Sequence, residues 1–307
     1  MMRNGQGKFL LLGLLAAFLG APGAAAAQDG TDVFVATLSV RGSNISVGRP
    51  RNVTQRAGYD NQPSFTPDGA SVLFTSIRED EQSDIWRVPF AGGAPVRVTS
   101  TSESEYSATA TPDGGGFSVI RVEQDSTQRL WKFPWDGTAP SVVLRGLRPV
   151  GYHVWVGESA IGAFILGQPN LGQPNLGQPN ALVLADPRSG RVDTLARDIG
   201  RAFARVPGRD AFTFAQLAGD TTWFSEVDVR TRSVRRLMRA PTGGEYHFWT
   251  ADGQCIASSG TRLYRWIDGR WDVLADFAEL GVKGITRLAV SPAGDRIAFV
   301  AEDGATP

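Results

Sequence analysis

The sequence predicts an all-β protein, a six-bladed β-propeller whose last blade is closed by the N-terminal strands. A phrase that recurs along the chain carries this prediction, because self-similarity at a fixed period is the sign of a repeat fold. The phrase is clearest at Phe65–Phe74 (FTPDGASVLF) and Ala110–Ile120 (ATPDGGGFSVI), and weaker copies lie at Trp249–Ile256 and Val290–Phe299. Its equivalent positions in the six units are Pro67, Pro112, Gly157, Pro207, Ala251 and Pro292. They are 45, 45, 50, 44 and 41 residues apart, about the length of one four-stranded blade.

The rest of each unit also matches a blade. Two further β-rich runs follow the phrase in the first five units, at residues 84–99, 129–144, 181–196, 223–237 and 262–274. Apolar and polar residues alternate in these runs around a turn, which is typical of paired strands with one face buried. Each unit therefore predicts two inner strands and an outer hairpin.

The ring is expected to close with strands from both ends of the chain. Only seven residues follow the sixth phrase at Ser291–Val300, so its outer hairpin is missing there. The segment Asp32–Thr54 supplies it, because it aligns with Asp84–Thr99: Val33 matches Ile85, and RNVT matches VRVT. Closure of this kind removes open sheet edges.

The first 27 residues have the pattern of a secretory signal. Arg3 and Lys8 precede the apolar run Phe9–Leu19, and the small residues Ala24–Ala27 suit cleavage before Gln28. The run has eleven residues, too few to span a bilayer. No cysteine follows it at which a lipid could be attached. We therefore expect a periplasmic or secreted protein, with residues 28–307 forming a single propeller domain.

Charge and motifs exclude several functions. The chain has 31 basic and 31 acidic residues, which argues against nucleic-acid binding because that needs a basic surface. It contains no G-x-S-x-G, H-E-x-x-H, phosphate-loop or calcium-loop motif. No cofactor is therefore predicted, and a monomer is expected.

Two units resemble a known family. The segments at residues 61–99 and 107–140, which contain the two clear phrases, resemble the WD-like repeats of the TolB-type periplasmic β-propellers. The resemblance implies a six-bladed ring and a binding role in the envelope. Similar repeats also form the propeller of prolyl-oligopeptidase-type peptidases, so the resemblance specifies the fold better than the task.

The candidate site lies on the first strand of each unit, because these strands line the channel of a propeller. Two units repeat a phrase there, Tyr152-His153-Val154-Trp155 and Tyr246-His247-Phe248-Trp249, which hold the chain's two histidines. The histidines are either ligand positions near the channel mouth or hydrogen-bonded residues inside the channel. No metal is predicted, because units three and five are not neighbours and a shared ion would need further ligands. The candidate ligand-binding residues at the mouth are Tyr152, His153, Trp155, Tyr246, His247, Trp249, Glu105 and Glu245.

Loops are expected around the same mouth. The tetrapeptide GQPN occurs three times between residues 167 and 180, and Gly, Pro and Asn favour successive turns. This insert is expected to project over the mouth. The loops Ile77–Ser83 and Val122–Gln128 are acidic and could attract a basic partner.

Two functions follow from these observations. The first is a non-catalytic scaffold that binds a protein or peptide partner of the envelope. The alternative is a secreted propeller enzyme, or a binder of carbohydrate or peptide, that uses the channel. For an enzyme, Glu105, Glu245 and Asp60 are the candidate acids, since they precede first strands.

Overall fold

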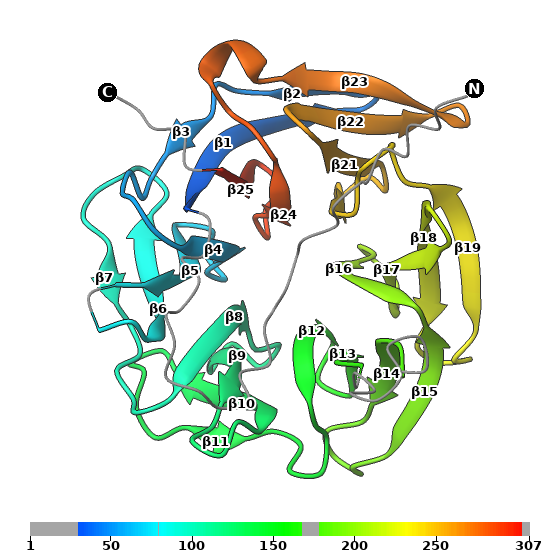
Figure 1. Cartoon of the computed structure of the whole chain (residues 1–307). Helices are drawn as coiled ribbons and strands as arrows, with labels where there is room; N and C mark the ends of the chain where they lie inside the picture. The colour runs from blue at the N-terminus through cyan, green and yellow to red at the C-terminus, as the bar shows by residue number, and fades with distance from the viewer. Residues whose placement is uncertain (1–29, 79, 168–177, 303–307) are drawn as a thin grey trace, which may run out of the picture.

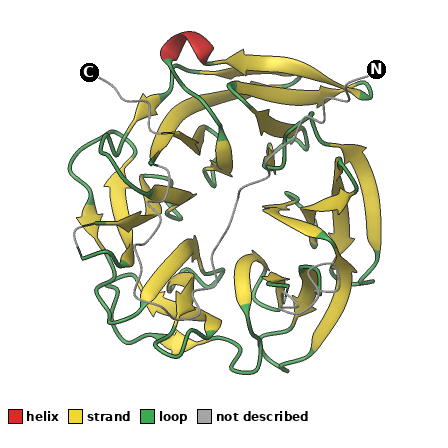
Figure 2. Ribbon diagram, viewed as in Figure 1, coloured by secondary structure: helices red, strands yellow, loops and turns green. Residues whose placement is uncertain are grey.

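Six antiparallel sheets surround a common axis in the computed structural model, which describes residues 30–78, 80–167 and 178–302 (Figure 1). Each sheet is one blade, and its first strand lies nearest the axis. Among the described residues the one helical element is the 3-10 turn η1 (Ala278–Leu280), which is drawn in red in Figure 2. The predicted all-β, six-bladed propeller is confirmed.

The strands of successive blades occupy equivalent places. The innermost strands are β4 (Asp60–Phe65), β8 (Ser104–Ala110), β12 (Val150–Val156), β16 (Ile199–Arg205), β20 (His247–Trp249) and β24 (Thr286–Val290). The second strands are β5 (Ser71–Ile77), β9 (Gly116–Val122), β13 (Ala160–Ile165), β17 (Ala211–Ala218), β21 (Cys255–Ser259) and β25 (Arg296–Glu302). The third strands are β6 (Ser83–Pro89), β10 (Gln128–Pro134), β14 (Ala181–Ala185), β18 (Thr221–Asp228), β22 (Arg262–Ile267) and β1 (Thr31–Arg41). The outer strands are β7 (Val96–Arg97), β11 (Ser141–Val142), β15 (Val192–Arg197), β19 (Val234–Arg239), β23 (Arg270–Asp276), β2 (Asn44–Val47) and β3 (Arg51–Asn52).

The recurring Pro-Asp-Gly triplet makes the turn between the first two strands. In blade 1, Asp68 accepts hydrogen bonds from the hydroxyl of Thr66 (2.6 Å) and the backbone N–H of Ala70 (2.9 Å). Gly69 has a φ of 65°, which favours glycine. Asp113 repeats this arrangement in blade 2. The phrase that reveals the fold is therefore a turn.

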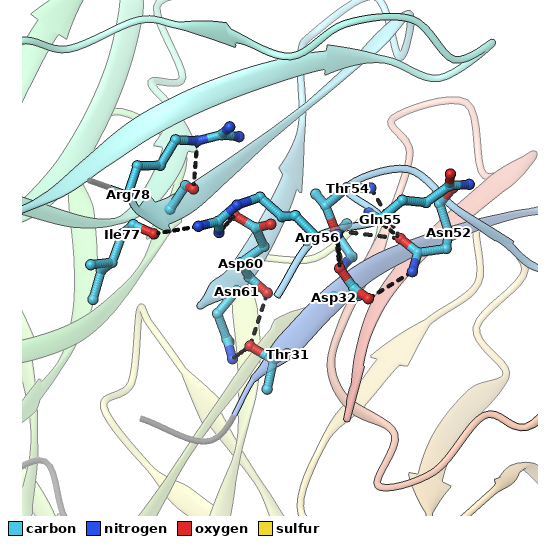
Figure 3. Close-up of polar contacts among 12 residues, drawn as sticks. Thr31, Asp32, Asn52, Thr54, Gln55, Arg56, Asp60, Asn61, Ile77 and Arg78 are labelled. Atoms are coloured by element: carbon cyan, nitrogen blue, oxygen red, sulfur yellow. Dashed lines mark hydrogen bonds and ion pairs between the residues drawn. The ribbon is translucent and has the colours of Figure 1, made fainter. Parts of the chain in front are cut away.

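The ring is closed by the N-terminal strands, as predicted. Strand β1 pairs with β25, and β3 pairs with β1 so that Phe34 faces Asn52, just as Trp86 faces Arg97 in blade 1. The side chain of Asp32 accepts hydrogen bonds from Asn52 and Thr54, both 2.7 Å long (Figure 3). The last blade thus has the outer-strand register of the first.

The hydrophobic core lies between blades. A phenylalanine recurs seven residues after the turn marker on four second strands, and each is less than 2% exposed: Phe74, Phe164, Phe214 and Phe299. Burial of an aromatic ring contributes a few kcal/mol at each blade contact, of order 2–3 by area. This packing fixes the inner strands around the channel.

Two predicted segments lie outside the described residues. They are the signal segment, residues 1–27, and most of the GQPN insert, residues 168–177. At the base of the insert, the backbone N–H of Gly167 donates to the Asn180 side chain (2.8 Å). Within the part of the chain that is described, no helix has the length and hydrophobicity needed to cross a bilayer.

Candidate functional site

Three innermost strands carry a β-bulge at the same place in the repeat. Pairing with the second strand shifts register between Asn61 and Ser64 in β4, and equivalent shifts occur in β8 and β24. The bulged residue has a left-handed backbone, with φ of 57° at Gln62, 56° at Ser107 and 55° at Arg287. This conformation costs a residue with a side chain roughly 1–2 kcal/mol. Strained residues of this kind concentrate where ligands are held, and these three line the channel.

A cavity of about 120 Å³ lies where the six innermost strands converge. One equivalent residue from each blade lines it: Gln62, Ser107, Tyr152, Ala202, Tyr246 and Arg287. Among the described residues that form the lining, the charged side chains are Arg201 and Arg287, and no carboxylate is present. The lining is therefore positive, with tyrosine, hydroxyl and amide groups around the charge.

Arg287 holds a fixed place in this wall. Its guanidinium carbon lies 4.7 Å from the ring centre of Tyr152 and 5.0 Å from that of Tyr246. Its Nη2 donates a hydrogen bond to the Tyr152 hydroxyl (2.9 Å). Two cation–π contacts and one hydrogen bond orient the charged group. The two tyrosines that the repeated phrase predicted at the channel therefore meet the same arginine.

The wall formed by blades 1 and 2 is polar and hydrogen-bonded. The Gln62 side-chain oxygen accepts from the Thr75 hydroxyl (2.9 Å) and from the backbone N–H of Ser107 (3.0 Å). These bonds link the two bulges across the blade boundary. They leave the amide NH2 of Gln62 and the Ser107 hydroxyl as further polar groups of the wall.

The two histidines contact the preceding blades through their Nε2 atoms. His153 shares a 2.7 Å hydrogen bond with Ser118 in blade 2, and Trp155 donates its indole N–H to the same hydroxyl (2.9 Å). His247 and Trp249 repeat this arrangement around Thr213 in blade 4, at 2.7 and 2.8 Å. We call each set of three residues a hydroxyl clasp. Each clasp joins two neighbouring blades.

Burial decides the protonation of both histidine rings. Burial lowers the pKa of His153 to about 3 and that of His247 to about 4, and their exposed fractions are 8% and 2%. Both rings are therefore neutral near pH 7. Because Nε2 is already hydrogen-bonded and the rings pack against a blade, they are poor candidates for proton transfer, although both border the cavity.

The other predicted site residues are separated by the fold. Trp155 and Trp249 lie in the clasps and do not line the channel cavity. Trp155 instead lines a second cavity of about 220 Å³ beside the Pro112–Asp113 turn. The structure thus brings Tyr152, His153, Tyr246 and His247 to one cavity and leaves the tryptophans outside it.

The candidate acids lie in blade contacts and not in the lining. Glu105 is fully buried, accepts a hydrogen bond from Thr101 (2.5 Å) and pairs with Arg121 at 3.3 Å. Burial raises the pKa of Glu105 to about 7, against the hydrogen bond from Thr101 and the charge of Arg121. Glu245 accepts a hydrogen bond from the backbone N–H of Arg201 and so joins blade 5 to blade 4.

Asp60 lies at the junction of blades 6 and 1. It is buried and pairs with Arg56 at 3.3 Å, as Figure 3 shows. Burial raises its pKa, and hydrogen bonds and nearby arginines oppose this effect. In the described residues, no group of three or more His, Cys, Asp and Glu side chains could hold a metal ion.

Comparisons with known proteins identify the fold. No protein-family model matches the sequence, and neither does any curated protein. Among solved structures, the putative TolB from Agrobacterium tumefaciens has a TM-score of 0.67 and 18% identity over 90% of this chain and 99% of that one. The chain has a TolB-type propeller fold.

Other solved structures share this TolB-type fold. TolB from Acinetobacter baumannii matches with a TM-score of 0.51 and 16% identity, over 67% of this chain and 51% of that one, so the chain spans about half of that protein. A gluconolactonase from Xanthomonas campestris matches with a TM-score of 0.62 and 12% identity, over 93% and 99% of the two chains. At these identities the likeness establishes the fold and not the activity.

Sequence reasoning missed part of the wall of this TolB-type propeller. Arg287, Arg201, Gln62 and Ser107 line the cavity but have no local motif. A signal was present in the repeat itself, because three of them occupy the position equivalent to Tyr152. The bulges that bring them to the cavity depend on strand pairing, which a residue pattern does not display.

Proposed function

We propose that the protein is a non-catalytic binding module that holds a protein or peptide partner at the channel mouth. The size of the channel cavity, about 120 Å³, carries this proposal. Sites for whole small molecules usually enclose roughly 300–1,000 Å³. A cavity of this size suits one side chain or one chain end of a larger partner.

The chemistry of the lining supports binding over catalysis. The two cavity histidines have low pKa values and occupied Nε2 atoms. The candidate acids Glu105 and Glu245 serve blade contacts outside the lining. Fixed arginine and tyrosine groups recognise a ligand without a change in protonation.

We also infer that this module works in the periplasm or outside the cell. The charged and apolar pattern of residues 1–27 supports this location. Fusion of these residues to alkaline phosphatase, which is active only after export, tests it. Absence of phosphatase activity from an expressed fusion would count against the location and leave the binding proposal unaffected.

Site-specific crosslinking tests the binding role. A photoreactive phenylalanine analogue replaces Phe203, an aromatic residue of the cavity wall, in cells that express the full chain. A control protein carries it at Val96, which is 56% exposed on the outer strand β7. We expect a defined partner to crosslink at position 203 and not at 96, and Tyr246→Ala to abolish that crosslink.

Two crosslinking results would contradict the binding proposal. Crosslinks at position 96 alone would place the partner on the outer rim and overturn the proposal. Loss of all crosslinks at position 203 in a folded protein would favour the small-ligand alternative. That alternative is also supported by the gluconolactonase, an enzyme with the same fold.

A further inference from the structure

We infer that Arg287 is the anchor for a carboxylate group of the partner, and that the site takes an acidic side chain or a free chain end. This inference rests on the proposed function of the channel as a binding site. It follows from the contacts and the charge of the cavity.

Arg287 is the cavity arginine whose charge has no direct acidic partner. Within the described residues, no carboxylate oxygen lies within the 4.0 Å ion-pair limit of its guanidinium. Two other arginines of restricted exposure do have carboxylate partners, Arg121 with Glu105 and Arg129 with Glu123. Buried charges are costly unless paired, so the position favours an anion supplied from outside.

The donors of Arg287 match a carboxylate. A guanidinium has five N–H donors, and the Tyr152 hydroxyl accepts one of them (2.9 Å). The rings of Tyr152 and Tyr246 flank the group and restrict its rotation. A planar donor fork held in place can bind both oxygens of a carboxylate, and such paired charged bonds are the strong ones.

The surroundings reinforce this charge preference. Arg201 is the second charged residue of the lining, and it is also positive. Glu245 offsets part of this charge from outside the lining: it accepts the Arg201 backbone N–H, and its charge also acts on Arg287. Gln62, on the strand next to that of Arg287, and Ser107 add neutral polar groups to the lining. An acidic group in the cavity would therefore meet the charged donors of Arg287 together with neutral hydrogen-bonding groups.

Two blocked peptides that differ by one group provide the test. Ac-Ala-Ala-Glu-Ala-Ala-NH2 and its Gln counterpart have nearly the same shape, and only the first carries a carboxylate. Binding to the protein of residues 28–307 is measured by ligand-observed NMR titration. Succinate and succinamide serve as the small-molecule pair. We expect the acidic member of each pair to bind about tenfold more tightly or better.

Variants assign that preference to Arg287. Arg287→Gln should remove the discrimination, and Arg287→Lys should retain part of it, since a lysine keeps the charge but not the fork. Arg296→Gln is the matched control: Arg296 stacks on Phe90 at 4.6 Å and donates to a backbone carbonyl, but lies outside the cavity lining. It should leave the discrimination unchanged.

The outcomes separate this inference from the proposed function. Equal binding of the acid and amide members, retained discrimination in Arg287→Gln, or no binding of any probe at millimolar concentration would overturn the carboxylate site. A crosslink at position 203 that survives Arg287→Gln would support the binding role but not the carboxylate site. Binding of succinate but of neither peptide, together with no crosslink, would retain the anion site and remove the protein-binding role.

Discussion

The channel wall and the blade contacts are built from residues that are adjacent in the sequence, yet the two regions use the repeat differently. Tyr152 and Tyr246 face the cavity, whereas His153 and His247 complete hydroxyl clasps with the preceding blades. Along a strand, neighbouring side chains point to opposite sides. One repeated phrase therefore contains both a candidate ligand contact and a structural contact.

In the blade contacts, a hydroxyl residue in one unit occurs together with a histidine in the next unit. Six residues after the turn marker, a hydroxyl residue occurs in two units, Ser118 and Thr213, each followed in the next unit by a clasp histidine. The other four units have apolar residues there: Leu73, Ala163, Ala257 and Ala298. Buried polar groups are retained where a partner exists. At the channel position the same two units carry tyrosine, Tyr152 and Tyr246, whereas the other four carry Gln62, Ser107, Ala202 and Arg287, which differ in size and charge.

The largest expected effect comes from removing a clasp. His153→Ala and His247→Ala should each lower the free energy of unfolding by about 2–4 kcal/mol, because each leaves a void at a blade junction and removes the ring nitrogen that is hydrogen-bonded to the Ser118 or Thr213 hydroxyl. The two losses should add, since the clasps share no residue. Urea unfolding of the single and double variants measures this.

The matched variant for the clasp is Thr213→Ala, which keeps both rings but deletes the oxygen between them. It should cost about 1–3 kcal/mol, because His247 Nε2 and Trp249 Nε1 then lose their shared partner. If the histidine variants unfold like the wild type but lose peptide binding, the distinction between clasp and channel is wrong.

The fold was predictable because its signals are local and repeated. The Thr-Pro-Asp-Gly turns around Pro67 and Pro112 have fixed side-chain and backbone hydrogen bonds, so they remain visible in the sequence. Ring closure was also predictable, since Asn52 and Thr54 repeat the contacts of Arg97 and Thr99. Each of these contacts occurs in at least two blades.

The candidate site was only partly predictable. The repeated phrase pointed to Tyr152 and Tyr246, and both line the cavity. It could not identify Arg287, because that residue stands alone in its blade and depends on a bulge for its direction. It also suggested that the paired tryptophans share the site, whereas hydrogen bonds to Ser118 and Thr213 hold them in the clasps.

A pH-dependent effect of comparable size is expected at the contact of blades 1 and 2. The folded-state pKa of Glu105, about 7, lies above its ordinary value of 4.5, so its contribution to stability is present below pH 4.5 and is lost as the pH rises through 7. The loss at pH 8 is about 3 kcal/mol, at 1.36 kcal/mol per pKa unit. Urea unfolding between pH 5 and 8 should show this decline in the wild type relative to Glu105→Gln.

A variant of an exposed carboxylate, Glu279→Gln, controls for general charge effects. If the difference in unfolding free energy between wild type and Glu105→Gln is the same at pH 5 and pH 8, the buried contact does not titrate as described. Such a result would also show that the Glu105 contact does not differ from the histidine clasps in its dependence on pH.

The smallest effect on stability is expected from single hydroxyl groups in the channel wall. Tyr152→Phe keeps the ring 4.7 Å from Arg287 but deletes the acceptor of its hydrogen bond, so the free energy of unfolding should change by about 1 kcal/mol or less. Because the guanidinium loses one of its restraints, affinity for the glutamate peptide should fall about three- to tenfold. Tyr246→Phe is the matched control, since its ring lies 5.0 Å from Arg287 and no hydrogen bond joins the two side chains in the described structure. Equal losses of affinity in the two variants would show that the Tyr152 hydroxyl does not orient Arg287, and that ring contact alone defines the channel wall.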